Sequence, residues 1–204
     1  MWLPICRRSF VLWLLWPLGG RADVTPLLRR LDTEKQSIQT LAGEFTQRNR
    51  VKLFAQEMHS RGRFFFQRPR RIRFEYLSPD ASVVILDGDR ATLRTLGSAP
   101  QTFDLARDPA LRTVFDQLLL WLGTDSLART QAEYDLAAEN DRRLVLIPRP
   151  GSPMARAFRR VELEFDAKWL LHGIKLDEVS GDEKWISFTK MERNVKLPEG
   201  AFKP

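Results

Sequence analysis

The sequence has little of what hydrolytic or metal chemistry requires. Among its 204 residues there is one cysteine, Cys6, and there are two histidines, His59 and His172, neither of which belongs to a recognisable motif. No Gly-x-Ser-x-Gly, His-Glu-x-x-His or glycine-rich phosphate loop is present. We therefore expect no catalytic residues, no metal site and no cofactor. A single cysteine also forms no internal disulfide, so a hydrophobic core has to stabilise the fold.

Long hydrophobic runs are absent apart from one near the start of the chain. Arg7 and Arg8 precede the apolar stretch Phe10–Leu18, a pattern typical of a secretory signal peptide. The stretch is far shorter than the roughly 20 residues of a membrane-spanning helix. We predict cleavage after Ala22, export to the periplasm by either the general or the twin-arginine route, and one domain over residues 23–204. Because Cys6 precedes the apolar stretch, it cannot be a lipoprotein acylation site, and we expect no membrane anchor.

A strong excess of one charge is also missing. The formal net charge is +7, but three of the arginines lie in the predicted signal, which leaves 30 basic and 26 acidic residues, or +4. This balance argues against nucleic-acid binding. Six arginines nevertheless fall on two neighbouring predicted strands: Arg61, Arg63, Arg68, Arg70, Arg71 and Arg73. They form either a solvated strand face that discourages edge pairing or a surface for an anionic partner or for approach to a membrane.

The distribution of apolar residues predicts a mainly β protein of the α+β class. A helix is expected to begin at Thr25-Pro26, because Thr is a good cap and Pro suits the first helical position, and to end near Gly43, because leucines and Ile38 recur at helical spacing. A second helix, Pro109–Leu122, is apolar around much of its girth and ends at Gly123. Ten segments have strand character: 44–50, 60–67, 71–77, 82–86, 89–95, 134–139, 142–147, 159–166, 171–179 and 184–193. An antiparallel sheet of about ten strands can bury one face by curling around the second helix.

Aromatic residues are abundant on two of these strands. Strand alternation places Phe65 on one face and Phe64 with Phe66 on the other. In the next strand Phe74 shares a face with Ile72 and Tyr76. These residues line either a packed core or a ligand cavity, because the two look alike in sequence.

An ordered set of short motifs resembles the LolA family of outer-membrane lipoprotein carriers. The motifs are Phe45-Thr46-Gln47, then Gly62-Arg63-Phe64-Phe65-Phe66-Gln67-Arg68-Pro69, then Phe74-Glu75-Tyr76 with Ser78-Pro79, and then Leu86-Asp87-Gly88. Each motif alone is weak. Their order, after a signal peptide and before an apolar helix, is more specific, and the resemblance extends over the whole segment after the signal.

The resemblance implies a curved antiparallel half-barrel whose concave hydrophobic face is closed by helices. It also implies a monomeric periplasmic carrier that receives lipoprotein acyl chains from an ATP-driven release complex of the inner membrane and delivers them to an outer-membrane receptor. The family's arginine that bonds the helical lid and keeps the empty carrier closed corresponds to Arg68. The expected lining of the lipid cavity is Phe64, Phe66, Ile72, Phe74, Tyr76, Val114, Leu118, Leu119 and Trp121.

Three other functions stay open at this point. A paralogue on the same fold could carry another acylated product, such as a glycolipid or a polyketide-derived lipid. The protein could also be a sensor that binds lipid or misassembled envelope proteins and regulates a partner. An enzyme would need His59 or His172, and neither carries a motif.

Overall fold

The computed structural model describes residues 23–53, 56–122 and 130–203. The predicted signal peptide and the predicted helix end at Gly123 lie outside these residues. Within them, no helix is both long enough and apolar enough to cross a membrane.

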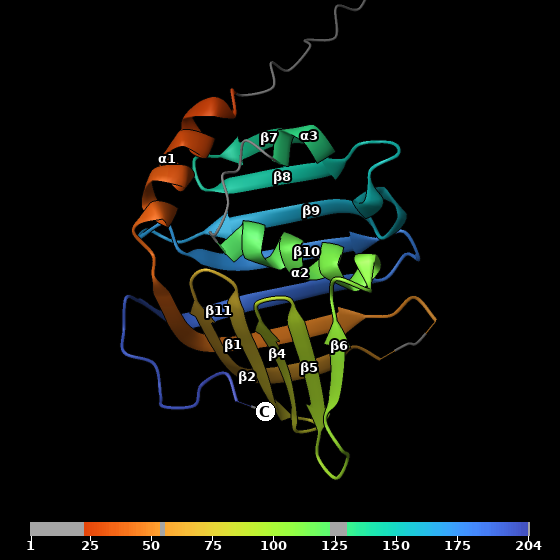
Figure 1. Cartoon of the computed structure of the whole chain (residues 1–204). Coiled ribbons are helices and arrows are strands. Elements are labelled where there is room, and N and C mark those ends of the chain that lie inside the picture. The colour runs from red at the N-terminus through yellow and green to blue at the C-terminus, as the bar shows by residue number, and fades with distance from the viewer. Residues whose placement is uncertain (1–22, 54–55, 123–129, 204) are drawn as a thin grey trace, which may run out of the picture.

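Eleven strands form one antiparallel sheet, which confirms the predicted fold class (Figure 1). The strand order is β6-β5-β4-β3-β2-β1-β11-β10-β9-β8-β7, so the sheet is open, with β6 and β7 at its edges. The strands are β1 Thr40–Arg50, β2 Met58–Gln67, β3 Arg71–Ser78, β4 Ser82–Asp87, β5 Arg90–Thr95, β6 Gln101–Asp104, β7 Tyr134–Asn140, β8 Arg143–Pro148, β9 Phe158–Phe165, β10 Leu171–Glu178 and β11 Glu183–Arg193.

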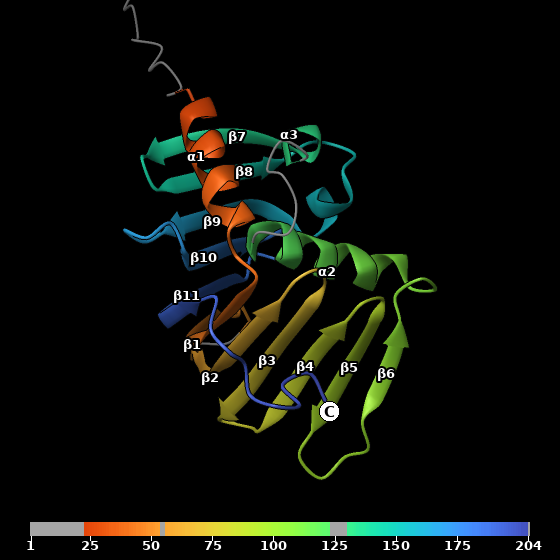
Figure 2. The same cartoon turned by 60° about the vertical axis from the view of Figure 1, so that its left-hand side comes forward.

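Helices cover the concave side of this curved sheet. They are α1 Thr25–Gln36, α2 Pro109–Leu122 and the short α3 Thr130–Glu133, with a 3₁₀ turn at Pro153–Arg156. In both views α2 crosses the hollow of the sheet, and α1 lies beside the part formed by β7 to β9 (Figures 1 and 2). The helix begins at Pro109, as predicted, and is helical as far as Leu122, the last residue described before the gap.

Four phenylalanines form the centre of the core on the concave face. Phe64 is fully buried, and its ring centroid lies 5.1 Å from that of Phe74 and 5.5 Å from that of Phe188. Phe45 packs edge-on against Phe74 at 5.4 Å. Gly62 is required beneath Phe45, because a Cβ there would lie 2.7 Å from that ring and 2.1 Å from the carbonyl oxygen of Glu75.

Two predictions about the first helix are wrong. It ends at Gln36, not near Gly43, because Leu41 pairs with Phe66 of β2 and with Arg193 of β11, so the sheet has already begun. Thr25 does not cap the helix with its side chain. The Asp23 carboxylate instead accepts a hydrogen bond from the Thr25 backbone N–H at 2.9 Å.

The first predicted strand, 44–50, begins earlier in the structure, at Thr40 of β1, and the other nine predicted strands agree with the structure to within two residues at each end. One strand, β6, was not predicted, and its four residues Gln101–Asp104 are all exposed. Among the described residues this strand pairs only with β5, so it lies at the edge of the sheet. Its exposed residues do not show the apolar alternation that predicts a half-buried strand.

Candidate functional site

An apolar pocket of about 300 Å³ lies between α2 and the concave face of the sheet. Its α2 wall consists of Leu111, Val114, Phe115, Gln117, Leu118 and Trp121. The opposite wall comes from both halves of the sheet and from the 3₁₀ turn: Gln47, Phe74, Tyr76, Val84, Met154, Phe158, Leu176, Lys184 and Ile186. The pocket is therefore a property of the whole fold, since strands far apart in sequence build it around one helix.

Only some of the residues predicted to line a cavity do so. Phe74, Tyr76, Val114, Leu118 and Trp121 are in the pocket wall. The remaining four are almost completely buried in the core and are not part of that wall: Phe64, Phe66, Ile72 and Leu119.

The strand residues in the pocket wall and those in the core lie on the same face of the sheet and differ only in their position along the strands. Phe66 pairs with Ile72 next to the β2–β3 turn, and this end of the face is filled by the core. Tyr76 lies farther along β3, where space is left under α2. Of the lining residues that the sequence analysis missed, Leu176 and Ile186 could have been found by strand alternation. Met154 lies in a loop turn and gave no such signal.

Three polar side chains of the pocket wall are partly exposed: Gln47, Tyr76 and Lys184. The Tyr76 hydroxyl donates to Gln47 Oε1 at 3.1 Å, and the Gln47 amide donates to Asn49 Oδ1 at 3.1 Å. Lys184 Nζ lies 3.5 Å from Glu178 Oε1. Burial raises the pKa of Tyr76, so its hydroxyl keeps its proton at neutral pH and stays a donor. A mostly apolar wall with some partly exposed polar groups matches an amphiphile with a chain and a polar head.

Arg68 lies in the turn between β2 and β3 and forms hydrogen bonds with the C-terminal end of α1. Its Nε donates to the Ile38 carbonyl at 2.5 Å and its Nη2 to the Lys35 carbonyl at 2.9 Å. Its backbone N–H donates to the carbonyl of Gln39 at 2.9 Å. A cation at the C-terminal end of a helix is stabilised by the carbonyls that have no partner inside the helix. The side chain proposed as a lid latch thus contacts α1.

The same turn also holds α2, through Arg70, which was predicted to fall on a strand as one of six clustered arginines but lies in the turn. Arg70 Nη2 donates to Asp116 Oδ1 of α2 at 2.8 Å. Two arginines separated by one proline therefore hold the two helices that cover the sheet. The alternation of basic residues along the neighbouring strands gave no sign of this role, since Arg70 lies between the strands.

A buried lysine joins the two helices directly. Lys35 of α1 is 4% exposed, and its Nζ donates to the Leu120 carbonyl of α2 at 3.1 Å. Burial lowers the pKa of Lys35 to about 7; the negative charge of Asp32 opposes this shift, and the positive charge of Arg68 adds to it. Lys35 was not predicted, because a single lysine in an amphipathic helix is ordinarily solvated.

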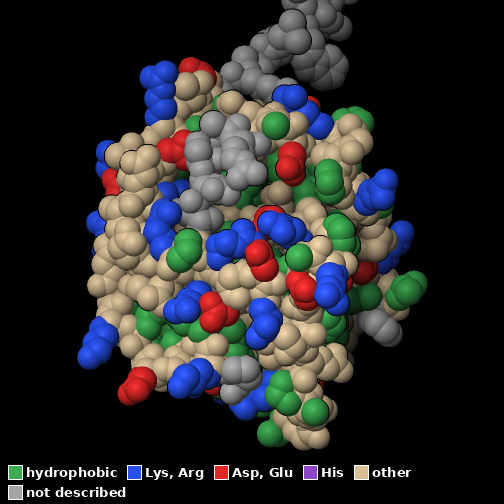
Figure 3. Space-filling model, in the orientation of Figure 1, with side chains coloured by type: hydrophobic (Ala, Val, Ile, Leu, Met, Phe, Trp, Pro, Cys, Tyr) green, Lys and Arg blue, Asp and Glu red, His purple; other side chains and the backbone are tan. Residues whose placement is uncertain are grey.

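The predicted arginine cluster is largely neutralised by nearby acids. Arg63 lies 3.1 Å from Glu75, and Arg71 lies 2.7 Å from Asp87. Figure 3 shows basic and acidic side chains interspersed over the face that it draws. These pairs favour the interpretation of a solvated strand face over that of a single anionic docking surface.

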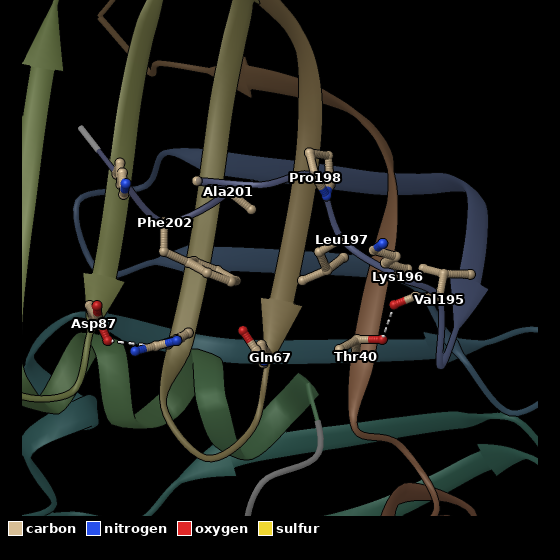
Figure 4. A pocket seen from close by; sticks show the side chains of 12 residues that line it. Thr40, Gln67, Asp87, Val195, Lys196, Leu197, Pro198, Ala201 and Phe202 are labelled. Carbon is tan, nitrogen blue, oxygen red and sulfur yellow. Dashed lines mark hydrogen bonds and ion pairs between the residues drawn. The ribbon is translucent and has the colours of Figure 1, made fainter.

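A second hollow, of about 540 Å³, lies on the convex face beneath the C-terminal segment (Figure 4). Phe202 and Pro198 of that segment lie over the sheet, and the Arg73 guanidinium donates to the carbonyl of Lys203 at 2.8 Å. The Arg71–Asp87 ion pair contributes to its lining. Its wall is mixed and partly charged, so it suits an acyl chain less well than the pocket under α2.

A solved structure supports the fold. A complex of MucA and MucB from Pseudomonas aeruginosa matches with a TM-score of 0.52 and 18% identity, over 90% of this chain and 61% of that one. This chain therefore spans less than two thirds of that relative. A LolA superfamily protein from Nitrosomonas europaea matches with a TM-score of 0.44 and 12% identity, over 89% and 97% of the two chains. The lipoprotein LppX from Mycobacterium tuberculosis gives 0.44 and 11%, over 85% and 99%.

Sequence comparison gives the family. No curated protein matches the chain significantly. The family model described as outer membrane lipoprotein carrier protein LolA, however, matches residues 36–204, which include the whole sheet, α2 and the pocket. The chain therefore belongs to the LolA family.

Proposed function

We propose that this protein is a periplasmic carrier that takes up the acyl chains of a lipoprotein, or of a related lipid, in the pocket under α2. It receives its cargo from an ATP-driven release complex of the inner membrane and delivers it to a receptor at the outer membrane. The observation that carries the proposal is the apolar pocket between α2 and the sheet, whose wall includes a few polar groups. Membership of the LolA family supports it.

The size of the pocket bears on what the carrier holds. At about 300 Å³ it lies at the lower end of the range for small-molecule sites, which is roughly 300–1,000 Å³. A cargo with several acyl chains therefore requires α2 to move away from the sheet. The contacts of α2 with Arg70 and with Lys35 are polar bonds at specific points, which such a movement would break.

The free energy of burying an acyl chain is large enough to offset the loss of these polar bonds. Burying an acyl chain contributes about 0.8 kcal/mol per methylene. A hydrogen bond to a charged group contributes roughly 1.5–3 kcal/mol. A few buried methylenes therefore offset one such bond, and a chain of ordinary length offsets several.

A pair of valine variants tests the proposal. Val114 is 48% exposed and lines the pocket, whereas Val179 is 49% exposed and follows β10 outside it. We expect V114W to weaken binding of a fluorescent fatty acid by tenfold or more, because the indole occupies space at the pocket wall. V179W should bind the probe like the wild type.

The measurement is a fluorescence titration, with thermal unfolding of each variant to establish that it is folded. Equal affinities for wild type, V114W and V179W would place the probe elsewhere on the molecule. Absence of any saturable binding to the wild type would contradict the carrier function.

A further inference from the structure

The Arg61 side chain on β2 forms no ion pair and no hydrogen bond with any described residue. It is exposed on the convex face of the sheet, opposite the pocket under α2. Each of the other five arginines of the predicted cluster is bound to a carboxylate or to a backbone carbonyl: Arg63, Arg68, Arg70, Arg71 and Arg73. Arg61 therefore keeps the capacity of its guanidinium to bind an anion.

Two hydroxyl side chains lie in a row with Arg61 across three neighbouring strands. Thr46 of β1 is paired with Arg61 on one side and with Ser187 of β11 on the other. The Cβ atoms of such directly paired residues lie about 5 Å apart on the same face of a sheet. Neither hydroxyl forms a hydrogen bond with a described residue. This row thus offers one guanidinium and two hydroxyls to the same ligand.

The next row along the same strands adds a second arginine, whose position is fixed by an aromatic ring. Arg48 of β1 is paired with Trp185 of β11 and with His59 of β2. Its guanidinium stacks on the Trp185 ring, 4.0 Å from the ring centroid. Stacking engages the face of the guanidinium and leaves the N–H groups at its edge for hydrogen bonds.

One acid lies close to this second row. Glu57 is 3.6 Å from Arg48 Nη1 and 3.7 Å from His59 Nε2, distances that are too long for hydrogen bonds. It therefore neutralises one positive charge but engages none of the N–H groups in a hydrogen bond. With Arg48 and Arg61 together, the two rows keep a net positive charge.

The six residues of the two rows line a groove of about 510 Å³. Its described lining is completed by Gln47, Ser60 and Ser78 and includes no acidic residue. A neighbouring groove of about 430 Å³ also has Trp185 in its lining, but there the lining includes Glu162 and Glu164. An anion is therefore attracted to the first groove and repelled from the acids of the second.

The arrangement of donors suits a phosphate ester better than a carboxylate. Guanidinium groups bind both kinds of anion through paired N–H groups. A carboxylate presents its oxygens in one plane, whereas the oxygens of a phosphate ester are arranged tetrahedrally. A phosphate ester can therefore accept from both arginines and from a hydroxyl at the same time, and the groove has room for the group to which the phosphate is joined.

We infer that this groove binds a phosphate ester, with Arg48 and Arg61 on its oxygens and the Thr46 hydroxyl between them. The sheet separates the groove from the pocket under α2, so its ligand is a second molecule and not the cargo proposed above. Two sources present this chemistry: the phosphate of a membrane lipid headgroup, and a soluble phosphorylated compound.

A nuclear magnetic resonance titration with glycerol 3-phosphate tests the site itself. The reporter is the indole N–H signal of Trp185, which is identified as the signal missing from W185F. We expect a saturable shift that neither glycerol nor sodium chloride of matched ionic strength reproduces. The signal of Trp169, which does not line the groove, should stay in place.

Two variants with the same change in charge test the role of Arg61. R61Q should weaken binding of glycerol 3-phosphate by roughly three- to tenfold, the effect of one partly solvated charged hydrogen bond. R63Q should bind it like the wild type, because Arg63 lies on the same face of β2 but pairs with Glu75 and does not line the groove. E57Q should strengthen binding, by up to about fivefold, because the competing acid is removed.

Absence of a saturable shift in the wild type, or an affinity of R61Q within twofold of that of R63Q, would overturn the inference. R61Q should still bind a fluorescent fatty acid like the wild type, since the pocket under α2 is on the other face. These results therefore leave the carrier function to its own test.

Sedimentation with lipid vesicles separates the two sources of the phosphate. The vesicles contain either phosphatidylcholine alone or equal parts of phosphatidylcholine and phosphatidylglycerol. If the wild type and R63Q sediment with the phosphatidylglycerol vesicles more than R61Q does, the ligand is a lipid headgroup. Equal sedimentation of all three proteins, together with binding of glycerol 3-phosphate, identifies a soluble phosphate ester.

Discussion

Replacement of Phe64 by alanine is expected to lower the free energy of unfolding by about 3–5 kcal/mol, the usual cost of removing a fully buried phenylalanine ring. The Phe64 side chain has no solvent exposure and contacts two other rings, those of Phe74 and Phe188. Its loss leaves a cavity beside the rings of Phe74 on β3 and Phe188 on β11. Equilibrium unfolding in urea measures the change.

The matched control is the next residue. Phe65 lies on the convex face, where it pairs with Arg73 and keeps part of its surface exposed. Phe65→Ala should therefore cost less than half as much as Phe64→Ala. Equal losses for the two variants would mean that the concave face is not the core of this protein.

The second large effect is expected on lipid release. Arg68→Leu removes the bonds to the carbonyls of Ile38 and Lys35. If Arg68 is the lid latch of the proposed carrier, the variant also loses part of the free energy that favours the closed, empty state. A bond of this charged kind contributes roughly 1.5–3 kcal/mol, and 1.4 kcal/mol changes an equilibrium tenfold. We expect the variant to fold and to release a bound acyl probe to acceptor vesicles at least about tenfold more slowly.

Arg71→Leu serves as the control for this experiment. Arg71 is three residues away, is exposed, and pairs with Asp87 beside the hollow on the convex face. Its replacement should leave the release rate unchanged. A wild-type release rate for Arg68→Leu would show that this arginine only stabilises the end of α1.

The sequence predicts most of the sheet because its strands alternate clearly. The three successive phenylalanines illustrate this, since alternation places Phe64 and Phe66 on one face and Phe65 on the other, as observed. Leu41 shows the limit of such patterns. It is buried and falls at helical spacing from Ile38, yet it belongs to β1 because its backbone pairs with two neighbouring strands.

The boundary between core and pocket could not be predicted from the same pattern. Phe64, Phe66, Phe74 and Tyr76 all lie on the concave face, but only the last two line the pocket. What separates them is the position of α2 above the sheet. The bonds that position α2 are made by Arg70, in a turn, and by Lys35, on the first helix, both far from α2 in sequence.

The most direct test of the carrier function is native mass spectrometry of the protein released gently from the periplasm. The account predicts a fraction with an additional noncovalent mass that corresponds to a lipid or lipoprotein, and this fraction should be lost in V114W but kept in V179W. A wild-type protein that shows only its own mass, even after incubation with lipid vesicles, would contradict the claim that the pocket under α2 binds a lipid.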